Sequence, residues 1–193
     1  MRSHLQYRVE AIVVIDRFIK WSRRKYSREQ RILRFIPVGL FFLLGFPLIL
    51  FSCQTIDREL NLPKLLIEPY NLLLASILVT FGLFFAIWST LALFKVGEGT
   101  PVPTIPTQKL VTTGPYTLCR NPMTFGIVVY YLGISLWLNS LFAVILTTLF
   151  LLCSIAYIKL VEEKELKARF GREYEEYKRK TPFLIPRLRR RES

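Results

Sequence analysis

Histidine is almost absent from this sequence of 193 residues, since His4 is the only one. A single histidine near the start of the chain argues against a Ser-His-Asp triad, a His-ligated metal and an axial haem ligand. The three cysteines, Cys53, Cys119 and Cys153, are isolated and odd in number. They indicate neither a disulfide framework nor a metal cluster, and we expect no bound metal.

Nucleotide-binding motifs are missing as well. Gly97-Glu98-Gly99 is followed by Val102 where a Rossmann fingerprint needs a third glycine, and no strand pattern precedes it. The sequence contains no P-loop and no set of kinase motifs. These absences exclude a Rossmann dinucleotide fold and P-loop chemistry.

Ionisable side chains are missing from residues 121–158, a run of 38 residues between Arg120 and Lys159. At about 1.5 Å per helical residue, this run is nearly twice as long as a hydrocarbon core of roughly 30 Å. It must therefore cross a membrane twice. The turn-forming pair Asn139-Ser140 marks a tight hairpin between the two spans, so both outer ends should emerge on one face.

Two further uncharged segments, residues 35–56 and 70–94, are also long enough to cross a bilayer. We therefore predict an all-α fold, a polytopic membrane bundle of about four transmembrane helices. The first span holds two prolines and two glycines between residues 37 and 47, so we expect a kink there.

Lysine and arginine are concentrated on one side of the predicted membrane. Residues 1–34 hold ten of them, 95–120 three and 159–193 twelve, whereas the loop 57–69 holds two. The positive-inside rule then predicts that both termini are cytoplasmic. The net charge of +13 favours contact with anionic lipid headgroups over nucleic acid, for which no binding module is present.

The segments before and after the spans are amphipathic. Residues 9–21 place apolar side chains on one side of a helix and charged ones on the other, which predicts a helix in the membrane interface. We therefore divide the chain into a basic interfacial segment, 1–34, and one membrane domain, 35–193. After the last span, a cytosolic tail helix is predicted to carry the ion pairs Glu163–Lys167 and Glu165–Arg169.

A loop rich in glycine and proline and an acidic pair are the candidate site. Residues 97–122 contain eight glycines and prolines, which predict an ordered, irregular path. Exposed backbone at membrane depth is tolerated only where protein buries it or where it lines a polar cavity. Pro122 should open a helix with Asn121 as its N-cap. The hairpin returns Glu162-Glu163 to the same face, where they suit a cationic ligand or simply begin a helix.

Several motifs in the C-terminal half carry a resemblance. They are Lys109-Leu110-Val111-Thr112-Thr113-Gly114-Pro115-Tyr116, Arg120-Asn121-Pro122-Met123, Glu162-Glu163, Phe170-Gly171-Arg172-Glu173-Tyr174-Glu175-Glu176-Tyr177 and Ile185-Pro186. In order and spacing, over residues 95–186, they resemble the isoprenylcysteine carboxyl methyltransferase and phospholipid methyltransferase family. The resemblance implies a helical membrane enzyme that binds S-adenosylmethionine in a cytosolic pocket and takes a lipid or lipidated substrate from the bilayer.

The resemblance also implies a set of site residues. Cofactor contacts would fall on Gln108, Leu110, Val111, Tyr116, Asn121, Pro122, Met123, Thr124 and Glu162 or Glu163. Arg120 is the candidate catalytic residue, because it could orient an anionic substrate head; it could equally anchor the helix end at the headgroups. The carboxyl methyltransferases have Arg-His-Pro-x-Tyr where this chain has Asn121 and Thr124 in place of the His and Tyr. The Asn-Pro-Met variant also resembles the phosphatidylethanolamine methyltransferases.

The resemblance implies methyl transfer to a lipophilic acceptor at the cytosolic membrane face. The absence of an obvious base favours an isoprenylcysteine-type carboxylate, which has no proton to lose, over a phospholipid amine as the alternative. The sequence also leaves open an NADPH-dependent enzyme similar to sterol reductases, which share part of the motif pattern, and a non-catalytic membrane subunit. A panel of labelled-methyl acceptors would distinguish them.

Overall fold

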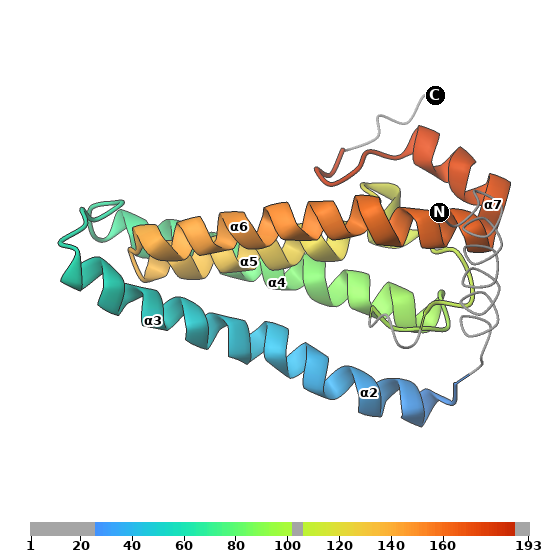
Figure 1. Cartoon of the computed structure of the whole chain (residues 1–193), viewed down its shortest axis with the longest axis horizontal. Helices are drawn as coiled ribbons and strands as arrows, with labels where there is room; N and C mark the ends of the chain where they lie inside the picture. The colour runs from blue at the N-terminus through green and yellow to red at the C-terminus, as the bar shows by residue number, and fades with distance from the viewer. Residues whose placement is uncertain (1–25, 102–105, 188–193) are drawn as a thin grey trace, which may run out of the picture.

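The computed structural model describes residues 26–101 and 106–187, and all regular structure within them is helical. The long helices run roughly along one axis (Figure 1). The elements are α2 (Arg28–Leu40), the π-helical turn η1 (Phe41–Gly45), α3 (Phe46–Glu59), α4 (Tyr70–Lys95), the 3₁₀ turn η2 (Gly114–Thr117), α5 (Pro122–Trp137), α6 (Leu141–Tyr157), the π-helical turn η3 (Ile158–Glu162) and α7 (Glu163–Lys180). The predicted all-α membrane bundle is confirmed.

Three helical runs are long and apolar enough to cross a membrane: Arg28–Glu59, Tyr70–Lys95 and Leu141–Lys180. The uncharged part of the last run ends at Ile158. A further helix, α5, is also apolar. It has only 16 residues, so it is about 24 Å long and shorter than a hydrocarbon core. The predicted interfacial helix 9–21 lies outside the described residues.

The first span contains an irregular turn where a kink was predicted. The turn η1 joins α2 to α3 without breaking the helix, and Pro37 lies inside α2. Helix α2 begins at a capping box, in which Ser27 accepts from the Gln30 backbone N–H and Gln30 accepts from that of Ser27, each at 3.2 Å. These bonds satisfy two backbone donors that a helix start leaves open.

Helices α4 and α5 approach each other closely because glycines remove side chains from their interface. A Cβ atom on Gly82 would lie 2.4 Å from the Tyr130 backbone nitrogen, and one on Gly126 would lie 2.5 Å from that of Ala86. Small residues of this kind let the backbones of membrane helices pack directly. The loop between α4 and α5 therefore begins and ends on two closely packed helices.

The tight turn between α5 and α6 is confirmed, and it also anchors the neighbouring loop. Asn139 adopts a φ of 52°, a conformation that asparagine tolerates better than most residues. Its side-chain oxygen accepts from the backbone N–H of Leu65 and Leu66, and its amide donates to the Leu66 carbonyl. Ser140 caps α6 by accepting from the Ala143 N–H at 3.1 Å. We call this end of the bundle the hairpin end.

Helix α7 departs from the single tail helix that the sequence predicts. Gly171 adopts a φ of 51° and divides α7 into two arms, and the second arm turns back on the first (Figure 1). The predicted pair Glu163–Lys167 is therefore wrong, because the fold brings Glu175 to Lys167 at 2.8 Å instead. The predicted pair Glu165–Arg169 is present at 3.0 Å.

Candidate functional site

The C-terminal segment after α7 is bound to the loop that precedes α5. The Arg120 backbone N–H donates to the Pro182 carbonyl at 2.8 Å, and that of Arg187 donates to the Leu118 carbonyl at 3.0 Å. Asn121 occupies the N-cap of α5 and Pro122 opens the helix, as predicted. The Asn121 side chain does not cap the helix, however, because its amide donates to the Phe183 carbonyl at 2.8 Å. We call this end of the bundle the polar end.

Arg120 and Glu163 lie at the same end of the bundle, as the hairpin predicts, and they form an ion pair there. Arg120 Nη1 lies 2.5 Å from Glu163 Oε1, and the two side chains are only 11% and 13% exposed. Lys178, on the second arm of α7, pairs with the other oxygen of the same carboxylate. Although burial opposes ionisation, hydrogen bonds from Lys178 and Arg120 hold the pKa of Glu163 below its usual value. Glu163 is therefore ionised, and each of its carboxylate oxygens has a cationic partner.

A cavity of about 470 Å³ lies beside this ion pair. It runs between the loop before α5, the first arm of α7 and the ends of α5 and α6. Eight of the eleven predicted site residues line it: Leu110, Val111, Tyr116, Arg120, Asn121, Met123, Thr124 and Glu162. The cavity therefore gathers most of the residues that the family resemblance singled out.

Three predicted site residues do not line the cavity. The Gln108 side chain donates to the Pro106 carbonyl at 3.1 Å. Pro122 is buried in the first turn of α5, and Glu163 faces Arg120 and Lys178. Their predicted contacts with a cofactor stay predictions.

Glu162 lines the cavity, and among the residues that the structure describes, none forms a hydrogen bond or ion pair with its carboxylate. We therefore call Glu162 the open acid of the cavity. Burial, followed by the charges of Glu165 and Glu163, raises the pKa of Glu162 to about 7. Adjacent Glu162 and Glu163 thus differ in character, because one is paired twice and the other faces the cavity alone.

Two cavity residues that the site prediction missed are Glu165 and Arg169, one and two turns further along α7. Arg169 Nη1 donates to Glu165 Oε1 at 3.0 Å, and their side chains are 8% and 15% exposed respectively. The spacing from Glu162 by three and then four residues places all three on one helix face. That spacing is the signal that could have identified them from the sequence.

Two tyrosines line the cavity near its charged residues. Tyr116 and Tyr177 both line it, and the Tyr177 hydroxyl donates to the Tyr116 carbonyl at 2.7 Å. Burial, together with the charge of Glu162, raises the pKa of Tyr116 well above its usual value. The Tyr116 hydroxyl is therefore a neutral hydrogen-bonding group at ordinary pH.

The cavity becomes apolar away from α7. Val38 and Phe42 enter from the first span, Ile127 from α5 and Phe150 from α6. A ligand here would meet charged and hydroxyl groups at one end and hydrocarbon at the other. This arrangement suits a polar molecule and a lipophilic one brought into contact.

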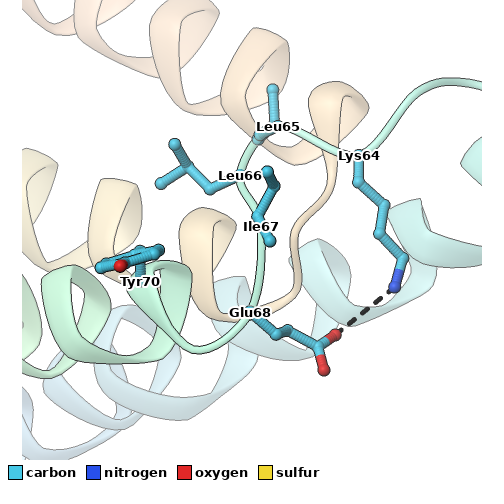
Figure 2. A pocket seen from close by; sticks show the side chains of 6 residues that line it. All are labelled: Lys64, Leu65, Leu66, Ile67, Glu68 and Tyr70. Carbon is cyan, nitrogen blue, oxygen red and sulfur yellow. Dashed lines mark hydrogen bonds and ion pairs between the residues drawn. The ribbon is translucent and has the colours of Figure 1, made fainter.

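A second hollow, of about 680 Å³, lies at the hairpin end between α3 and α4 (Figure 2). It is lined by Lys64, Leu65, Leu66, Ile67, Glu68 and Tyr70. Its two charged groups pair with each other at 3.4 Å, and Ile67 is 80% exposed. All of its lining comes from one short segment, and it lacks the convergent polar groups that mark a binding site. The cavity at the polar end is the candidate functional site.

Residues 70–173, just over half of the chain, match the phospholipid methyltransferase family. Two curated relatives are similar over a shorter stretch. The nickel-cobalt-cadmium resistance protein NccN of Alcaligenes xylosoxydans xylosoxydans is 38% identical over 81 residues, and the cobalt-zinc-cadmium resistance protein CzcN of Cupriavidus metallidurans is 39% identical over 80. These stretches cover 42% and 41% of this chain, but only 37% and 36% of the relatives. No solved structure matches significantly.

Proposed function

Because the chain belongs to the phospholipid methyltransferase family, we propose that it transfers a methyl group from S-adenosylmethionine to a lipophilic acceptor at the membrane surface. The observation that carries this proposal is the open Glu162 carboxylate at the polar end of a cavity whose other end is apolar. S-adenosylmethionine, when bound, supplies a reactive methyl group on a positively charged sulfur.

The cavity suits such a cofactor in size and charge. Its volume of about 470 Å³ falls within the range of about 300–1,000 Å³ that is typical of small-molecule sites. The cofactor's ammonium and sulfonium groups are cations, and a partly buried carboxylate without a partner is stabilised by binding one. Leu110 and Val111 line the same cavity, where their backbone groups can contact the rest of the molecule.

The chain's own residues would act mainly by positioning. Glu162 binds a cation, the Tyr116 hydroxyl adds a neutral hydrogen bond, and Arg120 stays fixed because Glu163 holds its guanidinium. Methyl transfer needs the acceptor atom in line with the methyl group and the departing sulfur. Holding two reactants in that geometry removes much of the entropic barrier without a covalent enzyme intermediate.

The acceptor is a lipid, and we favour a lipid amine. Arg120 and Arg169 could attract a prenylcysteine carboxylate, but each already pairs with a glutamate. The Glu162 carboxylate in the cavity disfavours an anionic acceptor but not an amine. An amine must lose its proton before it attacks, and because Glu162 is occupied by the cofactor, we infer that the amine enters the cavity in its neutral form after losing that proton to water. The prenylcysteine carboxylate favoured by the sequence is the alternative.

Metal resistance is a role that the names of two relatives state for those proteins. In the described part of this chain, no group of three His, Cys, Asp or Glu side chains could hold a metal ion. The cavity therefore supports methyl transfer better than metal ligation.

The experiment is transfer of a labelled methyl group by the purified full-length chain in lipid nanodiscs. Phosphatidylethanolamine, a prenylcysteine and small lipophilic amines are the acceptors, and boiled protein is the control. We expect label in a lipid amine. Label only in the prenylcysteine would support the alternative acceptor. Cofactor binding with no labelled acceptor would favour a non-catalytic subunit, and NADPH binding in its place would favour a reductase.

A further inference from the structure

Arg169 connects α7 to the loop at Thr107 beside the cavity. It lies on the first arm of α7, lines the cavity and is only 8% exposed. One guanidinium nitrogen, Nη1, donates to Glu165 on the same helix, and the other, Nη2, donates to the backbone carbonyl of Thr107. The guanidinium carbon also lies 4.9 Å from the centre of the Phe170 ring. A planar, forked group of this kind suits two acceptors at fixed positions.

Thr107 belongs to a loop segment that is already packed tightly on the end of α4. A Cβ atom on Gly99 would lie 2.4 Å from the Thr107 Cα atom, so backbone meets backbone there. The backbone N–H groups of Gln108 and Lys109 both donate to the Gly97 carbonyl, at 2.6 and 3.2 Å. The segment leads directly into Leu110 and Val111, which line the cavity.

We propose that Arg169 is a positioning residue of the cofactor site, which holds the loop backbone at 107–111 at a fixed separation from the Glu162 carboxylate. This inference rests on the proposed function. The loop and Glu162 belong to different elements that both line the cavity, and a ligand that contacts both binds well only when their spacing is set beforehand. Arg169 sets that spacing through its bond to Thr107, and it leaves Glu162 as the open acid by pairing with Glu165.

Arg172 provides a matched control on the same helix. It also pairs with a glutamate four residues away, Glu176, at 3.1 Å, but its side chain is 92% exposed and does not line the cavity. Arg169→Met and Arg172→Met remove the same charge and the same kind of helix pair. They differ in burial beside the cavity and in the bond to the loop.

The experiment uses the full-length chain in nanodiscs and compares wild type, Arg169→Met, Arg169→Lys and Arg172→Met. Calorimetry measures affinity for S-adenosylmethionine, hydrogen exchange of the 106–113 amides is followed without ligand, and melting reports the fold. In Arg169→Met we expect affinity to fall by roughly tenfold or more, the effect of losing a charge-assisted hydrogen bond, with faster exchange in 106–113. Arg169→Lys should recover part of the affinity, and Arg172→Met should match wild type.

Three results overturn the inference, and they differ in what they mean for the function. If wild type binds the cofactor and Arg169→Met binds equally well, the positioning role is wrong while the proposed function stands. If wild type binds no cofactor, the proposed function fails and the inference fails with it, even when exchange in 106–113 is faster. A large loss of melting temperature in Arg169→Met with no recovery in Arg169→Lys would assign Arg169 a structural role instead.

Discussion

Arg120 and Glu163 lie 43 positions apart in the sequence, and their side chains meet at 2.5 Å at the polar end of the bundle. The contact ties the loop before α5 to the first turn of α7. It also accounts for the different surroundings of the two adjacent acids, because Glu163 turns toward Arg120 and Lys178 while Glu162 faces the cavity.

Glu163→Gln should reduce stability and leave cofactor affinity nearly unchanged. The change leaves the nearly buried Arg120 guanidinium without its anion, and losing one partner of a buried pair costs about 3 kcal/mol or more. Thermal melting and calorimetry with S-adenosylmethionine measure the two effects. Glu176→Gln, which alters the exposed pair with Arg172, is the control. A large loss of affinity at an unchanged melting temperature would mean that Glu163 contacts the cofactor.

Glu162 should make both stability and cofactor binding depend on pH. Its pKa is raised from 4.5 to about 7, so the folded chain binds more protons than the unfolded chain within that interval. The stability of the ligand-free protein should therefore fall as pH rises through the interval and level off above about pH 7. A cationic ligand favours the carboxylate, so its affinity should rise with pH and level off at the same point.

The control for this pH dependence is Glu162→Gln, which removes the titrating group but keeps a similar volume. Melting and calorimetry at several pH values should show flatter profiles for the variant. Glu163 and Glu165 also face this region and titrate, so the difference between the two proteins is the measured quantity. Identical profiles would mean that Glu162 is not the group responsible.

Gly82→Ala should separate α4 from α5 and destabilise the bundle. The added methyl carbon would lie 2.4 Å from the Tyr130 backbone nitrogen, which cannot move without shifting the helix. Overpacking of this kind costs about 1–3 kcal/mol. Gly39→Ala is the matched control, because its nearest neighbour is the Phe35 ring at 3.1 Å. Equal melting temperatures for the two variants would contradict the packing described for α4 and α5.

The fold was largely predictable because membrane spans follow from the length of uncharged segments. The hairpin at Asn139 was also predictable, since asparagine and serine interrupt an otherwise apolar run. The fold-back of α7 at Gly171 was not. A glycine inside a helical pattern is usually tolerated, and the turn is visible only in the structure, from the backbone of Gly171 and from the contacts of the second arm with Lys167 and Glu163.

The candidate site could be located from the sequence, but its charges could not be assigned. The uncharged hairpin placed the acidic pair on the same face as the loop. The two acids are adjacent in the sequence, so the pattern could not show which of them faces the cavity. The irregular turn η3 precedes α7 and sets that rotation, and it leaves Glu162 open and Glu163 paired. The spacing of Arg169 from Glu162 and Glu165 could have placed it on the cavity face, but its bond to the Thr107 backbone carbonyl leaves no side-chain signal in the sequence.

The two ends of the bundle should lie on opposite sides of the membrane. Glu59 ends α3 at the hairpin end, and Arg172 is exposed at the polar end. Because lysine and arginine are concentrated beyond the polar end, we expect Arg172→Cys to be labelled from the cytoplasm and Glu59→Cys from the other side. Exposed Cys153 should first be replaced by serine. Labelling of both positions from one side would contradict this topology.

Binding of S-adenosylmethionine to wild type and Glu162→Gln tests the central claim most directly. If the open carboxylate holds a cationic group of the cofactor, the variant should bind more weakly by about 1.5–3 kcal/mol, the range for hydrogen bonds to charged groups. The variant should melt at or above the wild-type temperature at about pH 8, because it removes a buried charge. Wild type that is folded yet binds no cofactor, or equal affinity in the two proteins, would contradict the account.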